Sequence, residues 1–170
     1  DVDPGLNQLL NSFSINMWVK GPADTSTTFF QSFTAGQDVN DDMIFLRMSD
    51  WGDFKIETDT DGETLDFNAN VLDGAWHMIT ATYDHNTGKM TLFVDGAEDN
   101  TVTNAALGVL ALPADRTVNI GRKSDGSDYF AGNIDDVSLW RSALAADDVA
   151  AMYGAGAPGR LKESPGADAF

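Results

Sequence analysis

The stretch WHMITATYDHNTGKMTLFVDG, residues 76–96, decides the fold. Large and small side chains alternate along 76–83 and again along 90–94, with the period of two that a pleated strand imposes. Between these runs, residues 84–88 carry Asp, Asn and Gly, and Asn and Gly tolerate the positive φ of a tight reversal. Asp95-Gly96 has the chemistry of a second reversal. The stretch therefore predicts two antiparallel strands joined by a short turn.

Further strand patterns surround this hairpin, and turn residues separate them. We expect strands at 13–20, 28–33, 43–48, 54–58, 64–68, 118–121 and 133–140. Many short strands between turns predict an all-β sandwich or barrel. Trp18, Trp76 and Trp140 occupy strand positions, and we expect them in the core.

One helix is predicted, over 145–153. Acidic residues in its first turn favour the helix dipole, and Gly154 is the expected stop. Its buried side is expected to carry Leu144, Val149, Met152 and Tyr153. We expect one domain over residues 1–155, followed by a linker or edge segment over 156–170.

The composition narrows the function classes. The chain has 170 residues, 27 acidic against 10 basic side chains, a formal net charge of −17 and no cysteine. Such acidity repels phosphate backbones, so we expect no nucleic-acid partner. No run reaches membrane-span length and no signal peptide is present, so we expect no membrane insertion. The acidity suits a secreted or cell-surface protein in salty or calcium-rich surroundings, or it serves solubility alone. Because the chain opens on Asp1 without a methionine, we expect a domain excised from a longer protein.

Together with the hairpin at 76–96, four segments resemble laminin G-like and pentraxin domains. They are FSINMWVK (13–20), VNIGR (118–122), GNIDDVSLW (132–140) and RSALAADDVAAMY (141–153). The resemblance implies a concanavalin A-like jelly roll of two antiparallel sheets with one short C-terminal helix. That fold hosts lectins, adhesive modules, receptors and enzymes, so it leaves the function open.

Two acidic loops are candidates for a calcium site, at 36–42 and at 122–128. Calcium takes six to eight oxygens from carboxylates, amides and carbonyls, which two such loops could supply if they met at one edge of the sandwich. The alternative is that both loops are solvated turns, because Asp and Asn favour turns on their own.

The pentraxin resemblance implies particular ligands. Pentraxins bind calcium with an Asp-Asn pair before the strand that Met43 starts, and with acids in the later loop. Asn40 and Asp41 match the pair in reversed order, and Asp125 matches the last acid. Lys123 stands where pentraxins have a calcium-binding Glu, and its ammonium cannot ligate a cation, which argues against a two-calcium site. The predicted single-calcium set is Asn40, Asp41, Asp42, Asp125 and Asp128.

Trp51 is the main candidate for contact with a ligand. It lies in the turn Ser49-Asp50-Trp51-Gly52-Asp53, flanked by carboxylates. An exposed indole beside acids is typical of sugar sites, where the ring stacks on the sugar and the acids bond its hydroxyls. Alternatively, Trp51 folds back onto the sheet. The predicted ligand-binding residues are Trp51, Asp50, Asp53 and Tyr129.

The sequence offers no catalytic constellation, and we expect no enzyme. Glu57-x-Asp59-x-Asp61 is the nearest approach to the paired carboxylates of glycosidases, but Gly62 follows at once and a hairpin turn is expected. Neither His77 nor His85 lies in a triad context. We therefore expect a non-catalytic extracellular recognition module, a lectin-like domain that binds glycan or cell-surface polysaccharide with calcium, within a larger adhesin or polysaccharide-acting protein. The alternatives are a structural or protein-binding module with a purely stabilising calcium, and a glycosidase or lyase.

Overall fold

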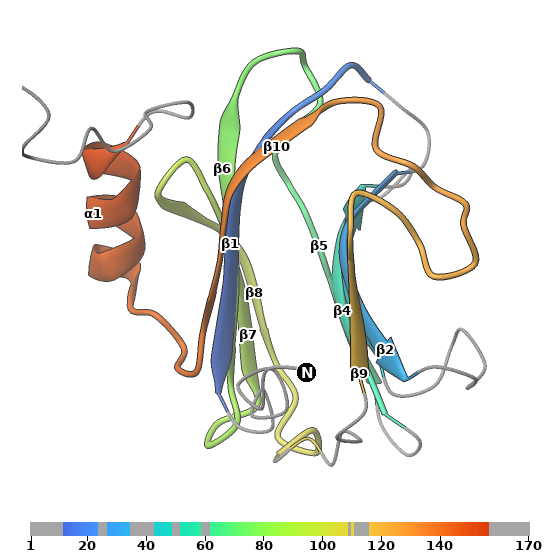
Figure 1. Ribbon diagram of the computed structural model, residues 1–170. Coiled ribbons are helices and arrows are strands. Elements are labelled where there is room, and N and C mark those ends of the chain that lie inside the picture. Colours follow the sequence, from blue (N-terminus) through green and yellow to red (C-terminus); the bar gives the residue numbers. More distant parts are fainter. Residues whose placement is uncertain are drawn as a thin grey trace, which may run out of the picture.

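Two five-stranded antiparallel sheets face each other in the computed structural model of this chain (Figure 1). The structure describes residues 12–23, 27–34, 43–48, 52–58, 62–108, 110 and 116–156. Sheet A has the order β10-β1-β6-β7-β8. Its strands are β1 Phe13–Lys20, β6 His77–Asp84, β7 Lys89–Val94, β8 Ala97–Thr103 and β10 Asn133–Trp140.

Sheet B has the order β5-β4-β3-β2-β9. Its strands are β2 Thr27–Thr34, β3 Met43–Met48, β4 Asp53–Glu57, β5 Gly62–Asp66 and β9 Arg116–Ile120. The predicted all-β, two-sheet antiparallel sandwich is confirmed, and only β8 has no counterpart among the predicted strands. β4 and β5 form a hairpin that pairs Glu57 with Gly62. This confirms the hairpin reading of that acidic segment.

The main core lies between the two sheets. Along β1, alternate residues from Phe13 to Val19 are fully buried and belong to the core cluster. Ile44, Leu46 and Phe54 of sheet B face them from the other side of the sandwich and belong to the same cluster. The apolar residues that alternate along the strands of both sheets therefore form one shared core layer.

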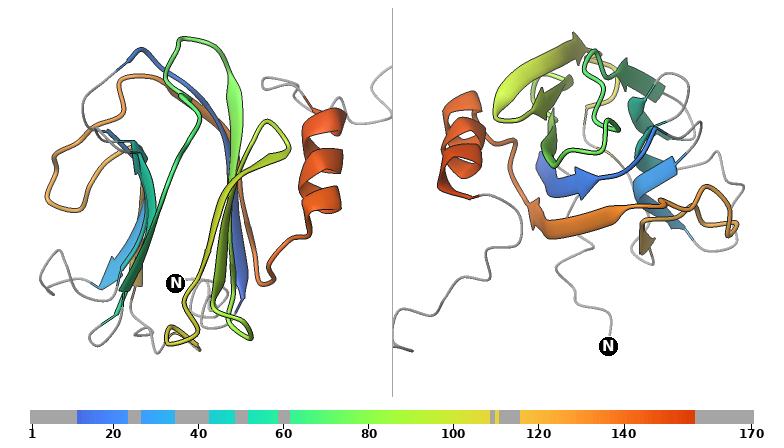
Figure 2. Two further views of the ribbon diagram at one scale, coloured as in Figure 1. Left: turned by 180° about the vertical axis from the view of Figure 1, so that it is seen from behind. Right: turned by 90° about the horizontal axis from the view of Figure 1, so that it is seen from above.

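The outer face of sheet A is covered by the helix α1, Ala146–Ala155 (Figure 2). Trp18, Met78, Phe93 and Val149 form a second buried cluster at this contact. The ring of Tyr153 stacks on Trp18 with centroids 5.6 Å apart. β1 is thus buried on both faces, which explains why its polar positions are also inaccessible.

The predicted turns and helix are found with some corrections. Gly88 at the hairpin turn has φ +70°, and a Cβ there would lie 2.0 Å from the Asn104 carbonyl oxygen, so only glycine fits. Gly154 does not stop the helix, which continues to Ala155 and is capped at Gly156. Trp140 is half-buried rather than in the core, because β10 lies at the edge of sheet A. Among the described residues, no helix has the length and hydropathy to cross a membrane.

Candidate functional site

On the outer face of sheet B, the described residues include no helix, and mainly polar residues line this face in two rows. Directly opposed residues of antiparallel strands share a face, and Ile44 and Leu46 of β3 point into the core. Their neighbours in β3 therefore point outward, together with the residues paired to them. One row contains Thr28, Arg47, Asp53 and Asp66, and the next contains Asn119, Gln31, Phe45, Lys55 and Thr64.

Phe45 and Gln31 form a buried floor in the middle of this face. Phe45 is 2 % exposed, although it belongs to neither core cluster. The Arg47 guanidinium carbon lies 5.4 Å from the centroid of the Phe45 ring, a cation–π contact. Gln31 is fully buried. The face is thus a packed surface with an aromatic and an amide beneath it.

The segment 121–132 between β9 and β10, called the arch below, bows outward beside sheet B (Figure 1). The amide of Ser124 donates to Gln31 Oε1 at 2.7 Å, and Gln31 Nε2 donates to Ser124 Oγ at 3.3 Å. The backbone amide of Thr28 donates to the carbonyl of Asp128 at 3.0 Å. These bonds hold the arch against β2, so its side chains have a fixed position over the face.

The Phe130 ring anchors the far end of the arch. It meets Phe29 of the core edge-on, with centroids 5.1 Å apart. A Cβ on Gly21 or Gly132 would lie 2.5 Å from a Phe130 ring carbon. The two glycines therefore leave the room that the anchor occupies.

Arg47 is the electrostatic centre of the outer row. Its Nε and Nη2 donate to the two carboxylate oxygens of Asp53 at 2.6 and 2.8 Å, a bidentate pair. This hydrogen bonding raises the pKa of Arg47 despite partial burial, and the negative charges of Asp53, Asp128 and Glu57 add to the effect. The sequence-predicted residues Asp53 and Asp128 thus act on the same guanidinium.

A buried hydroxyl in the same row has no partner. Thr28 is fully buried, its Oγ1 makes no hydrogen bond, and the residue pairs with Arg47 across β2 and β3. Buried polar atoms in native structures are nearly always hydrogen-bonded. The Thr28 hydroxyl is therefore an unsatisfied buried group beside Arg47, and its burial keeps it out of reach of a ligand on the surface.

The remaining ligand-binding predictions fall at the same end of sheet B or outside the described residues. Tyr129 in the arch is 59 % exposed, and its Oη lies 3.9 Å from where a Cβ on Gly126 would stand, so the ring lies along the arch. Asp50 and Trp51 lie outside the described residues, immediately before Gly52 and Asp53 in the chain. Their role in binding stays a prediction.

The described residues include only part of the predicted calcium set, Asp125 and Asp128. Asn40, Asp41 and Asp42 lie outside the described residues; the strand ends that flank them, Thr34 and Met43, are near one end of sheet B. The arch packs on Thr28, six residues or roughly 20 Å of extended strand from Thr34. The expected meeting of the two loops at one edge is therefore not supported by the strand ends from which they leave.

Asp125 shows how the described half of the predicted calcium set is used. Its Oδ1 accepts from Ser127 Oγ at 2.5 Å and Ser127 N at 2.9 Å, and Lys123 Nζ lies 3.3 Å from Oδ2. The bonds from Ser127 and the nearby lysine lower the pKa of Asp125. No group of three or more His, Cys, Asp or Glu suited to a metal occurs in the described part of the chain. These residues do not fit a calcium site on their own, and calcium stays a prediction centred on residues 40–42.

Sequence reasoning missed Arg47, Phe45, Gln31 and Thr28. The segment MIFLRM held a signal for two of them, because Ile44, Leu46 and Met48 alternate with Phe45 and Arg47. Phe45 and Arg47 are thus at outward positions of a strand whose other side is buried. An aromatic and an arginine on the same outward side indicate a packed surface with an ordered polar group, rather than a row of freely solvated side chains. Gln31 and Thr28 carried no such signal, since their burial depends on the arch.

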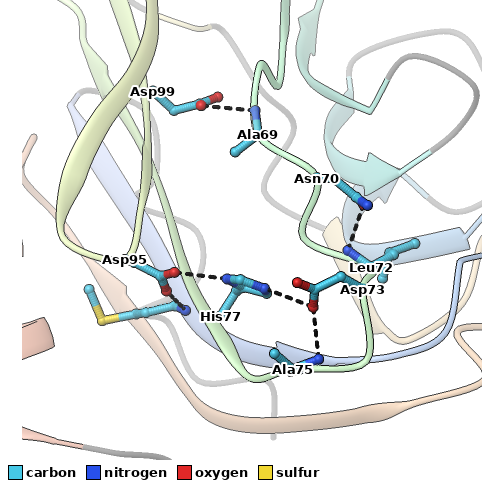
Figure 3. A network of polar contacts seen from close by, with 9 residues as sticks. Ala69, Asn70, Leu72, Asp73, Ala75, His77, Asp95 and Asp99 are labelled. Carbon is cyan, nitrogen blue, oxygen red and sulfur yellow. Dashed lines mark hydrogen bonds and ion pairs between the residues drawn. The ribbon is translucent and has the colours of Figure 1, made fainter.

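A separate polar cluster surrounds His77 at another edge of the sandwich (Figure 3). Its Nδ1 lies 2.8 Å from Asp95 Oδ2 and its Nε2 lies 3.1 Å from Asp73 Oδ1. Asp95 also accepts from Met78 N, and Asp73 from Ala75 N. Each carboxylate holds a backbone amide as well as the imidazole, so the cluster ties the crossing from β5 to β6 onto the β7–β8 turn.

Comparison with known proteins gives one family match. A laminin G family model, described as the concanavalin A-like lectin/glucanases superfamily, matches residues 2–150. Among curated proteins, a calpain-type cysteine protease of Zea mays is 29 % identical in an alignment 109 residues long, which covers 53 % of this chain and 5 % of that protein. The chain therefore corresponds to a small part of that protease.

Solved structures with the same fold include several sugar-binding proteins. The CBM40 of Ruminococcus gnavus IT-sialidase bound to alpha2,3 sialyllactose has a TM-score of 0.72 and 18 % identity, covering 88 % of this chain and 85 % of that one. The binding domain of botulinum neurotoxin DC has a TM-score of 0.62 and 15 % identity, covering 91 % and 38 %. A pentraxin from Limulus polyphemus has a TM-score of 0.63 and 14 % identity, covering 85 % and 71 %. At identities this low, the TM-scores show that these proteins share the fold of this chain.

Proposed function

This chain belongs to the concanavalin A-like lectin/glucanases superfamily, and from that premise we propose that it is a non-catalytic module that binds carbohydrate on the outer face of sheet B. The observation that carries the proposal is the construction of that face. A buried aromatic and a buried amide, Phe45 and Gln31, lie beside a row in which Arg47 and Asp53 hold each other in fixed positions. Rigid polar groups on a packed floor are what sugar hydroxyls require.

The chemistry of binding follows from the groups present. Carboxylates of Asp53 and Asp128 accept hydrogen bonds from sugar hydroxyls, and Arg47, held in place by Asp53, donates through its remaining N–H groups. The exposed ring of Tyr129 offers an apolar surface for a pyranose face. Trp51, which precedes Asp53 by two residues in the chain, is proposed as a second stacking surface.

The setting of the module is part of the same proposal. The binding of sialyllactose by the CBM40 with this fold supports a glycan as the partner. We place the module outside the cell, as one part of a larger adhesin or polysaccharide-acting protein, in keeping with its net charge of −17. Calcium belongs to the proposal as an ion held by Asn40, Asp41 and Asp42.

The test is a glycan array with the whole chain, run in calcium and again with a chelator, followed by variants. Tyr129→Ala should weaken binding about tenfold, the effect of losing about 1.4 kcal/mol of stacking, with an unchanged melting temperature. Tyr153→Ala is the matched control, because that tyrosine is 40 % exposed but lies on α1 at sheet A. Its binding should equal that of the unaltered chain.

Two other outcomes would change the assignment. Binding of no sugar under either condition would leave a structural or protein-binding module. Equal binding with and without chelator, together with no calcium heat in a titration of metal-free protein, would remove calcium while keeping the glycan.

A further inference from the structure

Three cations border the proposed glycan face, and each is paired with a carboxylate. Arg47 holds Asp53 in the bidentate contact described above, Lys55 Nζ lies 2.5 Å from Glu57 Oε2, and Lys123 Nζ lies 3.3 Å from Asp125 Oδ2. Lys55 and Glu57 are two residues apart on one strand and share the outward side. The positive charge of this face is therefore already neutralised within the protein.

Further carboxylates stand around these pairs. Asp66 is exposed at the end of the row, opposite Asp53, and the charge of Asp128 acts on Arg47. Carboxylates thus outnumber cations on the face. Arg122, at the start of the arch, is an exposed cation with no ion pair among the described residues. An exposed guanidinium attracts an anion weakly, because water and salt screen its charge.

We propose that the glycan bound on this face is neutral, and that Asp53 sets this specificity by occupying the guanidinium of Arg47. The inference rests on the proposed glycan-binding function and names its ligand class. It separates this chain from the CBM40 of the same fold, which was solved with a sialylated sugar.

Competition for Arg47 gives the physical reason. A sugar carboxylate would meet a guanidinium whose positive charge is already neutralised at its Nε/Nη2 edge by Asp53, a side chain that is only 9 % exposed. Displacing Asp53 would leave a buried charge without its partner, which costs more than an exposed ion pair returns. A neutral sugar meets no such competition, because its hydroxyls carry no charge and can donate to the outer lone pairs of the carboxylates.

The experiment compares an array of neutral glycans with their sialylated and uronic-acid counterparts. The unaltered chain should bind neutral members at least tenfold better than the matched acidic ones. Asp53→Asn removes the competing charge and frees Arg47, so acidic glycans should gain at least tenfold. Asp66→Asn is the control, since it removes the same charge from the same row without freeing a cation; its gain should be small.

The outcomes separate the two levels of the proposal. Binding of acidic glycans by the unaltered chain, as well as or better than neutral ones, would overturn this inference while leaving glycan binding in place; loss of that binding in Arg122→Gln would assign it to the arch. Equal gains in Asp53→Asn and Asp66→Asn, both with native melting behaviour, would also overturn it. If Asp53→Asn does not fold, the neutral-to-acidic ratio of the unaltered chain decides. Binding of no glycan at all would remove the proposed function and this inference together.

Discussion

The outer faces of the two sheets are built from similar strands but are covered in different ways. On sheet A, Trp18, Met78 and Phe93 are buried beneath the helix α1. On sheet B, Phe45 is buried beneath Arg47, beside an arch that hydrogen-bonds to β2. The helix face excludes water with apolar side chains and contributes stability, whereas the arch face leaves polar groups in fixed positions where a ligand can meet them.

Two buried amides, Asn16 on the outer face of sheet A and Gln31 on that of sheet B, make the contrast sharp. Asn16 of β1, 4 % exposed, accepts a hydrogen bond from Thr80 Oγ1 at 2.7 Å within sheet A. Gln31 of β2 is fully buried and holds Ser124 of the arch. The Asn16 amide oxygen thus accepts the hydrogen bond of a hydroxyl on the neighbouring strand β6. The Gln31 amide positions a loop, so its loss should affect binding as well as folding.

The largest effect is expected from Trp18→Ala. Removing a buried indole that packs between sheet A and α1 should lower the free energy of unfolding by about 3–5 kcal/mol. Urea unfolding measures this loss. Glycan affinity measured well below the unfolding midpoint should stay unchanged, and a loss of less than about 1 kcal/mol would show that the helix contributes little.

The matched amides should separate folding from binding. Gln31→Ala and Asn16→Ala should each cost about 1–3 kcal/mol, since each leaves a buried partner unsatisfied. Only Gln31→Ala should also reduce glycan affinity, because the Ser124 amide of the arch would lose its acceptor. Equal affinity of the two variants would place the ligand away from the arch.

Ala145→Ser should stabilise the helix face alone. Ala145 is the N-cap of α1 with extended φ and ψ of −74° and 157°, and it has no side-chain oxygen to cap the helix. Serine there should raise the free energy of unfolding by about 1 kcal/mol, and Ala145→Gly should raise it by a few tenths less than serine does, because glycine is also a favoured N-cap residue. Thermal melting of the three proteins would measure this, and a serine variant no more stable than the glycine one would contradict it.

The smallest effect should depend on pH and involve neither outer face. Burial lowers the pKa of His77, but the hydrogen bonds and charges of Asp95 and Asp73 outweigh it and raise the pKa above 6.5. The folded state therefore binds this proton more tightly than the unfolded state, so the contribution is complete below about pH 6.5 and is lost as the pH rises through the folded pKa. His77→Gln should flatten the pH dependence of stability in that window, with glycan affinity unaltered. An identical pH profile for both proteins would contradict this assignment.

Sequence patterns predicted the sandwich because every strand with one buried face shows the alternation that the pleat imposes. They predicted Trp140 wrongly, because β10 lies at a sheet edge, and only the strand order reveals an edge. They also placed the end of the helix at Gly154, whereas its last turn extends to Ala155. Tyr153 in that last turn packs on Trp18. Of the candidate site, Asp53 was predicted as a ligand-binding residue and Asp128 as a calcium ligand, but the sequence did not single out Arg47, on which both act.

By itself, the sequence determined the all-β class, the hairpin at 76–96 and the acidity of the chain, since these depend on local periodicity, turn chemistry and charge. Only the tertiary structure decided that Arg47, Thr28 and Gln31 form one face with the arch. Gln31 and Ser124 of the arch, for example, are 93 positions apart in the sequence. Their meeting depends on the strand order β3-β2-β9, which brings distant segments together through backbone hydrogen bonds that no local pattern records.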